Sequence, residues 1–200
     1  MATFQYACPE TLTEAVGLAS SNPGYSWIAG GTDFMVKLRL KRIEPSITID
    51  IGRLEELRQI RLEKETLYIG AAVTHTELTT SPLIGQYAPA LKEAAGMVGS
   101  PQIRNRGTVG GNICNASPAA DTVPALLAYG AKVLICGKTG QRRLELADFC
   151  TGPGRTILKS GEFLREIYFP VQRLRQGSSF QKLGKRKALA ISVVNAAAWL

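Results

Sequence analysis

The hydrophobic positions of the first fifty residues follow a helix period and then strand periods. Residues 11–14 (Thr-Leu-Thr-Glu) form a capping-box pattern, and apolar residues then recur at helical spacing up to residue 19. Asn22-Pro23-Gly24 ends this predicted helix. Residues 27–29 and 47–51 predict short strands, and residues 34–40 begin a helix or an extended segment. This part of the chain is therefore a mixture of helix and strand.

The pattern between residues 54 and 170 is also mixed. Residues 60–63 and 66–69 predict a hairpin that turns at Lys64-Glu65. A short helix from Thr76 must stop near Pro82, and residues 88–98 predict a better helix. Further predicted elements are a turn of helix at residues 54–57, a helix from about Thr122, and strands at residues 131–136, 144–146 and 163–169.

The last part of the chain is apolar up to its final residue. Residues 173–178 are polar and turn-like, which indicates a possible boundary. A strand from Phe180 and an apolar segment at residues 193–200 follow. We therefore expect the chain to end inside a packed element, as a fragment or a truncated product would.

The net charge of +8 favours an anionic partner or, equally, a basic surface with no special role. The basic runs at residues 37–42 and 182–187 contain none of the interleaved aromatic residues typical of single-strand nucleic-acid binding. We therefore expect no nucleic-acid partner. No apolar run approaches a membrane span, and residues 1–5 lack the features of a signal peptide. These patterns predict a cytoplasmic protein.

Cysteine and histidine are too scattered for a metal site. No two of the four cysteines, Cys8, Cys114, Cys136 and Cys150, have a CxxC spacing, and His75 is the single histidine. This argues against a zinc site and against a self-contained iron–sulfur cluster. We expect free thiols, and a packing or capping role for His75.

Two glycine pairs are the strongest chemical signal. They lie at residues 28–33 (Ile-Ala-Gly-Gly-Thr-Asp) and 107–112 (Gly-Thr-Val-Gly-Gly-Asn), and no lysine directly follows either pair. Loops of this kind bind phosphates through backbone N–H groups, and the missing lysine argues against a nucleotide triphosphatase. The spacing does not fit the G-x-G-x-x-G fingerprint, so a dinucleotide would lie across two lobes.

A polar segment follows the second glycine pair. It contains Asn112, Asn115, Ser117 and Asp121 within ten residues. A carboxylate is the natural partner of a ribose or ribityl hydroxyl, which suits Asp121. Asp121 could equally cap the helix that precedes Pro124.

The whole chain, in order, resembles the FAD-binding (medium) subunit of the molybdenum hydroxylases, the xanthine dehydrogenase and carbon monoxide dehydrogenase family. The resemblance rests on residues 29–33, 108–112, 116–118 with Asp121, 124–128 and 180–186. It implies an α+β fold: a two-lobed FAD-binding domain of the vanillyl-alcohol-oxidase (PCMH) type over residues 1–175. Lobe one would cover about residues 1–53 and lobe two about residues 54–175. Residues 176–200 would begin a C-terminal domain that is incomplete here.

The resemblance also implies which residues bind FAD. They are Ile28, Ala29, Gly30, Gly31, Thr32, Asp33, Phe34, Val98, Thr108, Val109, Gly110, Gly111, Asn112, Ser117, Asp121, Leu164 and Lys182. Lys182 would stabilise the reduced flavin ring. The alternative interpretation is that Lys182 is a solvated surface lysine. No catalytic or metal-binding residue is expected, because the cofactor carries the flavin chemistry.

The function implied by the resemblance is that of an oxidoreductase component. A partner subunit would carry molybdenum, and a 2Fe–2S subunit would pass electrons to FAD and on to NAD or another acceptor. A truncated, flavin-free assembly module is the alternative. A basic nucleotide- or nucleic-acid-binding domain is a weaker third hypothesis.

Overall fold

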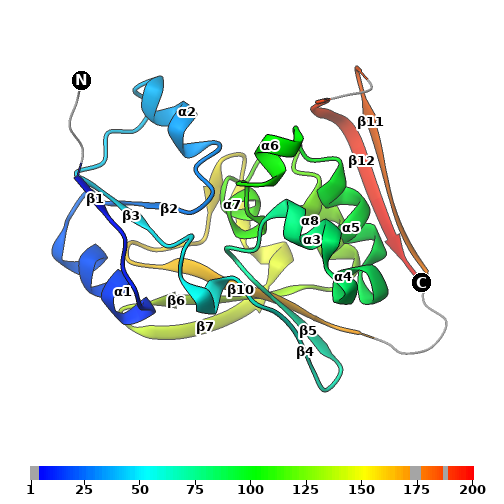
Figure 1. Cartoon of the computed structure of the whole chain (residues 1–200), viewed down its shortest axis with the longest axis horizontal. Coiled ribbons are helices and arrows are strands. Elements are labelled where there is room, and N and C mark those ends of the chain that lie inside the picture. Colours follow the sequence, from blue (N-terminus) through cyan, green and yellow to red (C-terminus); the bar gives the residue numbers. More distant parts are fainter. Residues whose placement is uncertain (1–4, 172–176, 187–188) are drawn as a thin grey trace.

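The structure is a computed structural model that describes residues 5–171, 177–186 and 189–200. It has mixed α+β architecture, with a small sheet at one end, a large sheet in the middle and a hairpin at the other end (Figure 1). The strands are β1 (Gln5–Ala7), β2 (Ser26–Ile28), β3 (Ile47–Asp50), β4 (Ile60–Glu63), β5 (Thr66–Gly70), β6 (Lys132–Gly137), β7 (Gly140–Glu145), β8 (Cys150–Gly152), β9 (Arg155–Thr156), β10 (Phe163–Pro170), β11 (Ser178–Gly184) and β12 (Ser192–Trp199). The helices are α1 (Leu12–Ser21), α2 (Phe34–Arg39), α3 (His75–Thr80), α4 (Pro82–Tyr87), α5 (Pro89–Gly96), α6 (Pro101–Arg104), α7 (Val109–Cys114) and α8 (Thr122–Ala128), with 3-10 turns at Glu55–Leu57 and Leu146–Asp148.

Residues 5–53, called the first lobe below, form a parallel sheet in the order β1-β3-β2. The predicted helix, α1, connects β1 to β2, because parallel strands need a crossover. Thr11 caps it by accepting the Glu14 N–H at 3.1 Å. The Glu14 carboxylate accepts from the Glu10 N–H rather than from Thr11, so the predicted capping box is only half formed. The segment at residues 34–40, which the pattern left open, is the helix α2.

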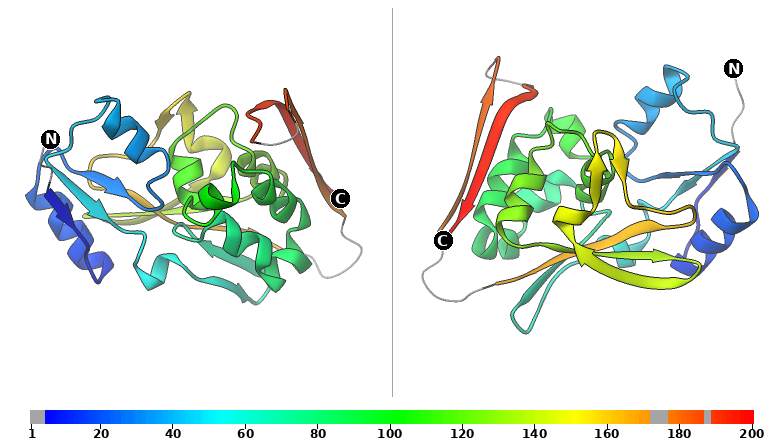
Figure 2. Two further views of the ribbon diagram at one scale, coloured as in Figure 1. Left: turned by 45° about the horizontal axis from the view of Figure 1, so that its top comes forward. Right: turned by 180° about the vertical axis from the view of Figure 1, so that it is seen from behind.

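Residues 54–171, the second lobe, contain an antiparallel sheet in the order β4-β5-β10-β6-β7. The predicted hairpin at residues 60–69 is confirmed as β4 and β5. Helices α3 to α8 lie between β5 and β6 in the chain and gather on one side of the sheet (Figures 1 and 2). Fully buried residues such as Ile69 and Ile167 from the sheet and Leu91 from α5 form the core between the two layers.

The predicted helix stop at Pro82 is also a helix start. Ser81 has an extended backbone, as the residue before proline prefers, and it ends α3. Its side chain then accepts the Ile84 N–H and caps α4, with Pro82 in the first turn. The sequence pattern predicts only the end of the first helix here, and α4 is a second helix that the same proline begins.

The prediction of a loop at the second glycine pair is wrong, since Gly110 and Gly111 lie in the first turn of α7. Thr108 caps this helix by accepting the Gly111 N–H at 3.0 Å. Glycine disfavours helices by about 1 kcal/mol relative to alanine, so packing rather than propensity maintains α7. A Cβ on Gly110 would lie 2.5 Å from the Cβ of Ala71. Glycine is therefore required for α7 to approach the sheet this closely.

The strand predicted from Phe180 is β11, which pairs with β12 as an antiparallel hairpin. The hairpin packs against α5 and α8 at the right of Figure 1. Phe180 is buried there, and its N–H donates to the Glu93 carboxylate at 2.8 Å. Most of the possible boundary at residues 173–178 lies outside the described residues. No helix in the described ranges is long and apolar enough to cross a membrane.

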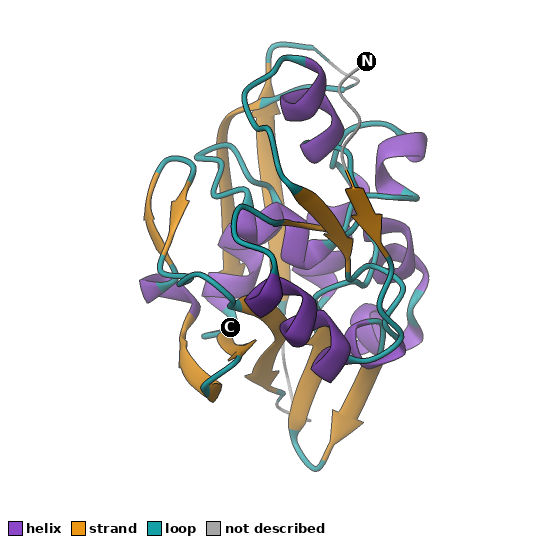
Figure 3. Cartoon of the chain, turned by 90° about the vertical axis from the view of Figure 1, so that its left-hand side faces the viewer, coloured by secondary structure: helices purple, strands orange, loops and turns teal. Residues whose placement is uncertain are grey.

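The two lobes share a hydrophobic core. Phe163 and Cys136 of the second lobe pack with Ile49 and Ala15 of the first lobe. Trp27 adds an edge-on contact with Phe163, at 5.3 Å between ring centroids, and donates through Nε1 to the Glu162 carbonyl at 2.9 Å. Figure 3 shows the molecule from the side of the first lobe. These contacts hold the facing surfaces of the lobes in a defined position.

Candidate functional site

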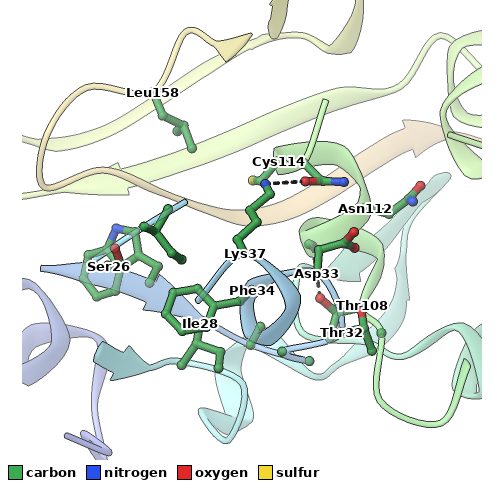
Figure 4. Close-up of a pocket in the computed structure, with 18 of the residues that line it drawn as sticks. Ser26, Ile28, Thr32, Asp33, Phe34, Lys37, Thr108, Asn112, Cys114 and Leu158 are labelled. Atoms are coloured by element: carbon green, nitrogen blue, oxygen red, sulfur yellow. Dashed lines mark hydrogen bonds between the residues drawn. The ribbon is translucent and has the colours of Figure 1, made fainter. Parts of the chain in front are cut away.

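A cleft of about 680 Å³ lies between the two lobes. The first lobe contributes the segment after β2, and the second lobe contributes the start of α7 and the segment before it (Figure 4). The predicted site residues that line it are Ile28, Ala29, Gly30, Gly31, Thr32, Asp33, Phe34, Val98, Thr108, Gly111 and Asn112. The structure thus brings together two segments that lie almost eighty residues apart in sequence.

The first glycine pair shapes the wall of the cleft in two ways. Gly31 has φ of +78°, a left-handed conformation that disfavours any other residue. A Cβ on Gly30 would overlap the carbonyl oxygen of Arg106 in the second lobe. Gly30 is therefore needed for contact between the lobes, whereas the sequence had indicated only close approach to a ligand.

The N–H groups of residues 30–33 donate to no acceptor in the described part of the chain. Backbone donors left without partners near a surface are satisfied by water or by a ligand. Four such donors in consecutive residues are suited to an anion such as a phosphate group.

The N–H groups of the second glycine pair are mostly engaged within the protein. The Val109 and Gly110 N–H groups donate to the carbonyl oxygens of Val73 and Ala71, both at 2.9 Å. The Gly111 N–H donates to the side chain of Thr108, the N-cap residue of α7. The side chain of Asn112 accepts from the Thr122 hydroxyl at 2.7 Å through its oxygen, which leaves its NH₂ group for the cleft.

Four predicted residues lie behind or beside the cleft. Val109 is fully buried, and Gly110 packs against Ala71. Leu164 and Gly110 line a smaller, mainly apolar cavity of about 140 Å³ between the lobes. Ser117 accepts the Ala119 N–H at 3.2 Å in the turn before α8.

Asp121 and Lys182 form a buried ion pair outside the lining of the cleft. Their side chains are each 7% exposed, and Oδ2 and Nζ are 2.5 Å apart. Ser192 and Asn195 of β12 donate to the other carboxylate oxygen, at 2.7 and 3.1 Å. Asp121 stands at the N-cap position of α8, as the alternative expected, but its side chain makes no capping bond. Burial excludes a solvated Lys182.

This pair lies next to one end of the cleft. Lys182 also donates to the Met97 carbonyl at 3.2 Å, and the following residue, Val98, lines the cleft. Met97 and Lys182 line a second hollow of about 600 Å³ between α6 and the C-terminal hairpin. The predicted residues Val98, Asp121 and Lys182 are therefore neighbours, although only Val98 contacts the cleft itself.

Sequence reasoning missed several residues that line the cleft, among them Lys37, Cys114 and Asn115. Burial raises the pKa of the Cys114 thiol to about 12, so this thiol stays protonated. Lys37 lies one helical turn after Asp33, and that spacing could have indicated it. The sequence placed Asn115 only in the polar segment after the second glycine pair, and no pattern indicates Cys114.

His75 also lines the cleft, and it is 2% exposed. Its Nδ1 has no partner among the residues that the structure describes. Burial lowers its pKa to about 4, so the imidazole is neutral at neutral pH. The predicted packing role fits this position. In the described ranges, no three His, Cys, Asp or Glu side chains come together as a metal site would require.

Comparisons with known proteins agree with one another. Residues 2–172 match the family model described as "FAD binding domain in molybdopterin dehydrogenase". The chain is 40% identical over 199 residues to the nicotinate dehydrogenase FAD-subunit of Eubacterium barkeri, covering 97% of this chain and 67% of the relative. It is 38% identical over 190 residues to the xanthine dehydrogenase FAD-binding subunit of Escherichia coli, and this match covers 94% of this chain and 65% of the relative.

The fold is similar to that of a solved carbon monoxide dehydrogenase from Hydrogenophaga pseudoflava. The TM-score is 0.90 at 34% sequence identity, and the match covers 94% of this chain and 66% of the solved chain. The chain thus spans about two thirds of the length of the relatives that it matches.

Proposed function

This chain belongs to the family of FAD-binding domains in molybdopterin dehydrogenases, and from that membership we propose that it is the FAD-binding, electron-transfer component of a molybdenum hydroxylase. The observation that carries the proposal is the cleft between the lobes. Its wall holds four consecutive backbone N–H groups, at residues 30–33, without partners in the described part of the chain. A dinucleotide has both the length to follow such a cleft and the phosphates to bind these donors.

The residues present fit FAD. The N–H groups of residues 30–33 and the NH₂ group of Asn112 would bind the diphosphate, since all are donors at the cleft with no acceptor in the described ranges. Apolar residues of the cleft and of the small cavity behind it, such as Ile28 and Leu164, would contact the ring systems. Val98, Asp121 and Lys182 would lie near the ring whose charge changes on reduction.

When bound, FAD supplies the redox chemistry, because it accepts electrons and passes them on. The protein's own residues bind and orient it and exclude water from part of it. We propose a molybdenum-containing partner and a 2Fe–2S partner as the source of the electrons, and NAD as one acceptor. Relatives that are named a "medium chain" or a subunit of a "complex" support an assembly of several chains.

We further propose that residues 1–175 are the FAD-binding domain of the PCMH type. Residues 176–200 would begin a second domain. The separate sheets of the two lobes and the independent pairing of β11 with β12 support this division.

The experiment that tests the function is flavin binding. The purified full chain, stripped of cofactor, is titrated with FAD while flavin fluorescence and absorbance are recorded. We expect saturable binding with one FAD per chain. Failure to bind FAD, together with recovery of partner subunits by the flavin-free protein, would instead support the assembly module.

A further inference from the structure

Lys37 reaches across the cleft from one lobe to the other. It lies on α2 of the first lobe, and its Nζ donates to Oδ1 of Asn115, directly after α7 of the second lobe, at 2.7 Å. Both residues line the cleft, and Figure 4 shows the Lys37 side chain extending from α2, with a dashed line for this bond. The ammonium group therefore lies within the proposed cofactor site.

No carboxylate neutralises this ammonium group among the residues that the structure describes. Asp33 lies four positions earlier, one helical turn away, where an acid and a lysine commonly pair, yet the two form no ion pair in the part of the chain that the structure describes. Glu162, the other acid that lines the cleft, binds Arg142 at 2.7 Å instead. Lys37 thus keeps a full positive charge beside a neutral amide.

The diphosphate of FAD carries two negative charges. The N–H groups of Val109 and Gly110 already donate to carbonyl oxygens within the protein, as shown above. The free N–H groups of residues 30–33 provide only partial charges. A full cation that also donates hydrogen bonds would therefore strengthen phosphate binding at this site.

We propose that Lys37 neutralises the diphosphate of bound FAD and that Asn115 positions its ammonium group; this inference rests on the proposed function. An ammonium group has three N–H donors. Asn115 takes one of them, so two remain for phosphate oxygens without loss of the existing bond. Lys37, on the helix that follows the first glycine pair, thus replaces the lysine that would directly follow the pair.

The test compares three variants by FAD titration of the purified full chain. Lys37→Met removes the charge, Lys37→Arg keeps it, and Arg39→Met removes a charge from the same helix at a residue that does not line the cleft. A charge-assisted hydrogen bond is worth roughly 10- to 100-fold in affinity, so we expect Lys37→Met to weaken FAD binding by that factor. Lys37→Arg should retain most of the affinity, and Arg39→Met should bind like the wild type.

The salt dependence of FAD affinity is a second readout, because a purely structural role of Lys37 would not make the loss of affinity depend on salt. The loss caused by Lys37→Met should shrink as the salt concentration rises, because salt screens exposed charges. Asn115→Ala should cause a smaller loss of FAD affinity, and this loss should also shrink as the salt concentration rises. Folding is not at risk, since α2 has no buried residue and Lys37 is exposed.

Two outcomes would overturn the inference. One is wild-type affinity in Lys37→Met, and the other is an equal loss in Arg39→Met, which would indicate only a general effect of net charge. Both require a wild-type chain that binds FAD. If the wild type binds none, the proposed function fails first, so the two failures are distinguishable.

Discussion

At the scale of single residues, Gly30 shows how closely the lobes approach. Its missing side chain leaves room for the backbone of Arg106 and Gly107, and a Cβ would overlap the Arg106 carbonyl oxygen. The obstacle is backbone from the other lobe, so it cannot move aside by changing a rotamer. The wall of the cleft and the contact between the lobes therefore depend on the same glycine.

We predict that Gly30→Ala lowers the free energy of unfolding by about 1–3 kcal/mol, because overpacking forces the lobes apart. Gly17→Ala is the matched control, since no atom lies within 4 Å of a Cβ at that position in α1. It should raise the free energy of unfolding by about 0.5–1 kcal/mol, because alanine favours a helix interior over glycine. Urea denaturation of both variants measures the two changes, and equal stability would contradict this account of Gly30.

His75 makes stability depend on pH. Its pKa in the folded chain, lowered to about 4 by burial, is below the ordinary value of 6.5. The unfolded chain therefore binds a proton more readily between these values, so the contribution of His75 to stability is complete above pH 6.5 and is lost as the pH falls towards 4. Arg104 nearby also lowers the pKa, whereas Asp121 raises it.

We predict that His75→Gln removes part of this pH dependence. Between pH 7 and pH 4, the free energy of unfolding should fall by about 3 kcal/mol more in the wild type than in the variant, at one pKa unit per 1.36 kcal/mol. Urea denaturation across this pH range measures the difference. The acidic residues contribute equally to the pH dependence of both proteins, so their contribution cancels in this difference. Parallel pH profiles would show that His75 is not buried in its neutral form.

At the scale of elements, the C-terminal hairpin is attached to the second lobe by a polar cluster as well as by Phe180. Asp121 precedes α8, and it binds Lys182 of β11 and Ser192 and Asn195 of β12. One carboxylate thus joins both strands of the hairpin to the helix layer. Removal of this carboxylate would leave a buried ammonium group without a counter-charge.

We predict that Asp121→Ala lowers the free energy of unfolding by about 3–5 kcal/mol, as expected for one partner of a buried pair. Glu145→Ala is the control, because Glu145 and Lys132 form an exposed pair between β7 and β6. It should have a much smaller effect, because solvent screens an exposed pair. Thermal and urea denaturation measure both effects. The double variant Asp121→Leu/Lys182→Met should recover part of the loss, and no recovery would contradict the ion-pair explanation.

At the scale of the whole molecule, the cleft exists because two lobes with separate sheets share one hydrophobic core. Phe163 and Ile49 belong to different lobes but to the same buried cluster. A ligand bound in the cleft contacts both lobes at once. Its binding free energy therefore stabilises the arrangement of the lobes as well as each lobe.

We predict that FAD raises the stability of both lobes together. At a free concentration of one hundred times the dissociation constant, the gain is about 2.7 kcal/mol. Trp27 lies at the junction of the lobes, so its fluorescence in a Trp199→Phe background reports the junction, while circular dichroism reports the whole chain. Both probes should show the same raised midpoint. A shift seen by only one probe would place the ligand within a single lobe.

A feature could be predicted from the sequence where it depends on neighbouring residues, and could not where it depends on residues far apart in the chain. The hairpin at residues 60–69 was predictable, because alternation and a turn at Lys64 depend on adjacent residues. The helix α7 was not, because its glycines disfavour a helix and only packing on Ala71 selects it. For the candidate site, the glycine pairs indicated the two segments that meet. The sequence placed Lys37 in a basic run and Asn115 in a polar segment, but it could not indicate that the two meet, since their pairing joins positions 78 apart in the chain.

The sequence by itself determined the family, the dinucleotide class of ligand and most local elements, because motifs, caps and periodicity act over a few residues. Only the tertiary structure decided which donors are free. It showed that the amides of α7 are engaged with Val73 and Ala71, that Asp121 is paired with Lys182, and that the Lys37 ammonium group donates to Asn115 at the cleft. A hydrogen-bonding group binds either the protein or a ligand, and that choice depends on neighbours that folding brings from distant parts of the chain.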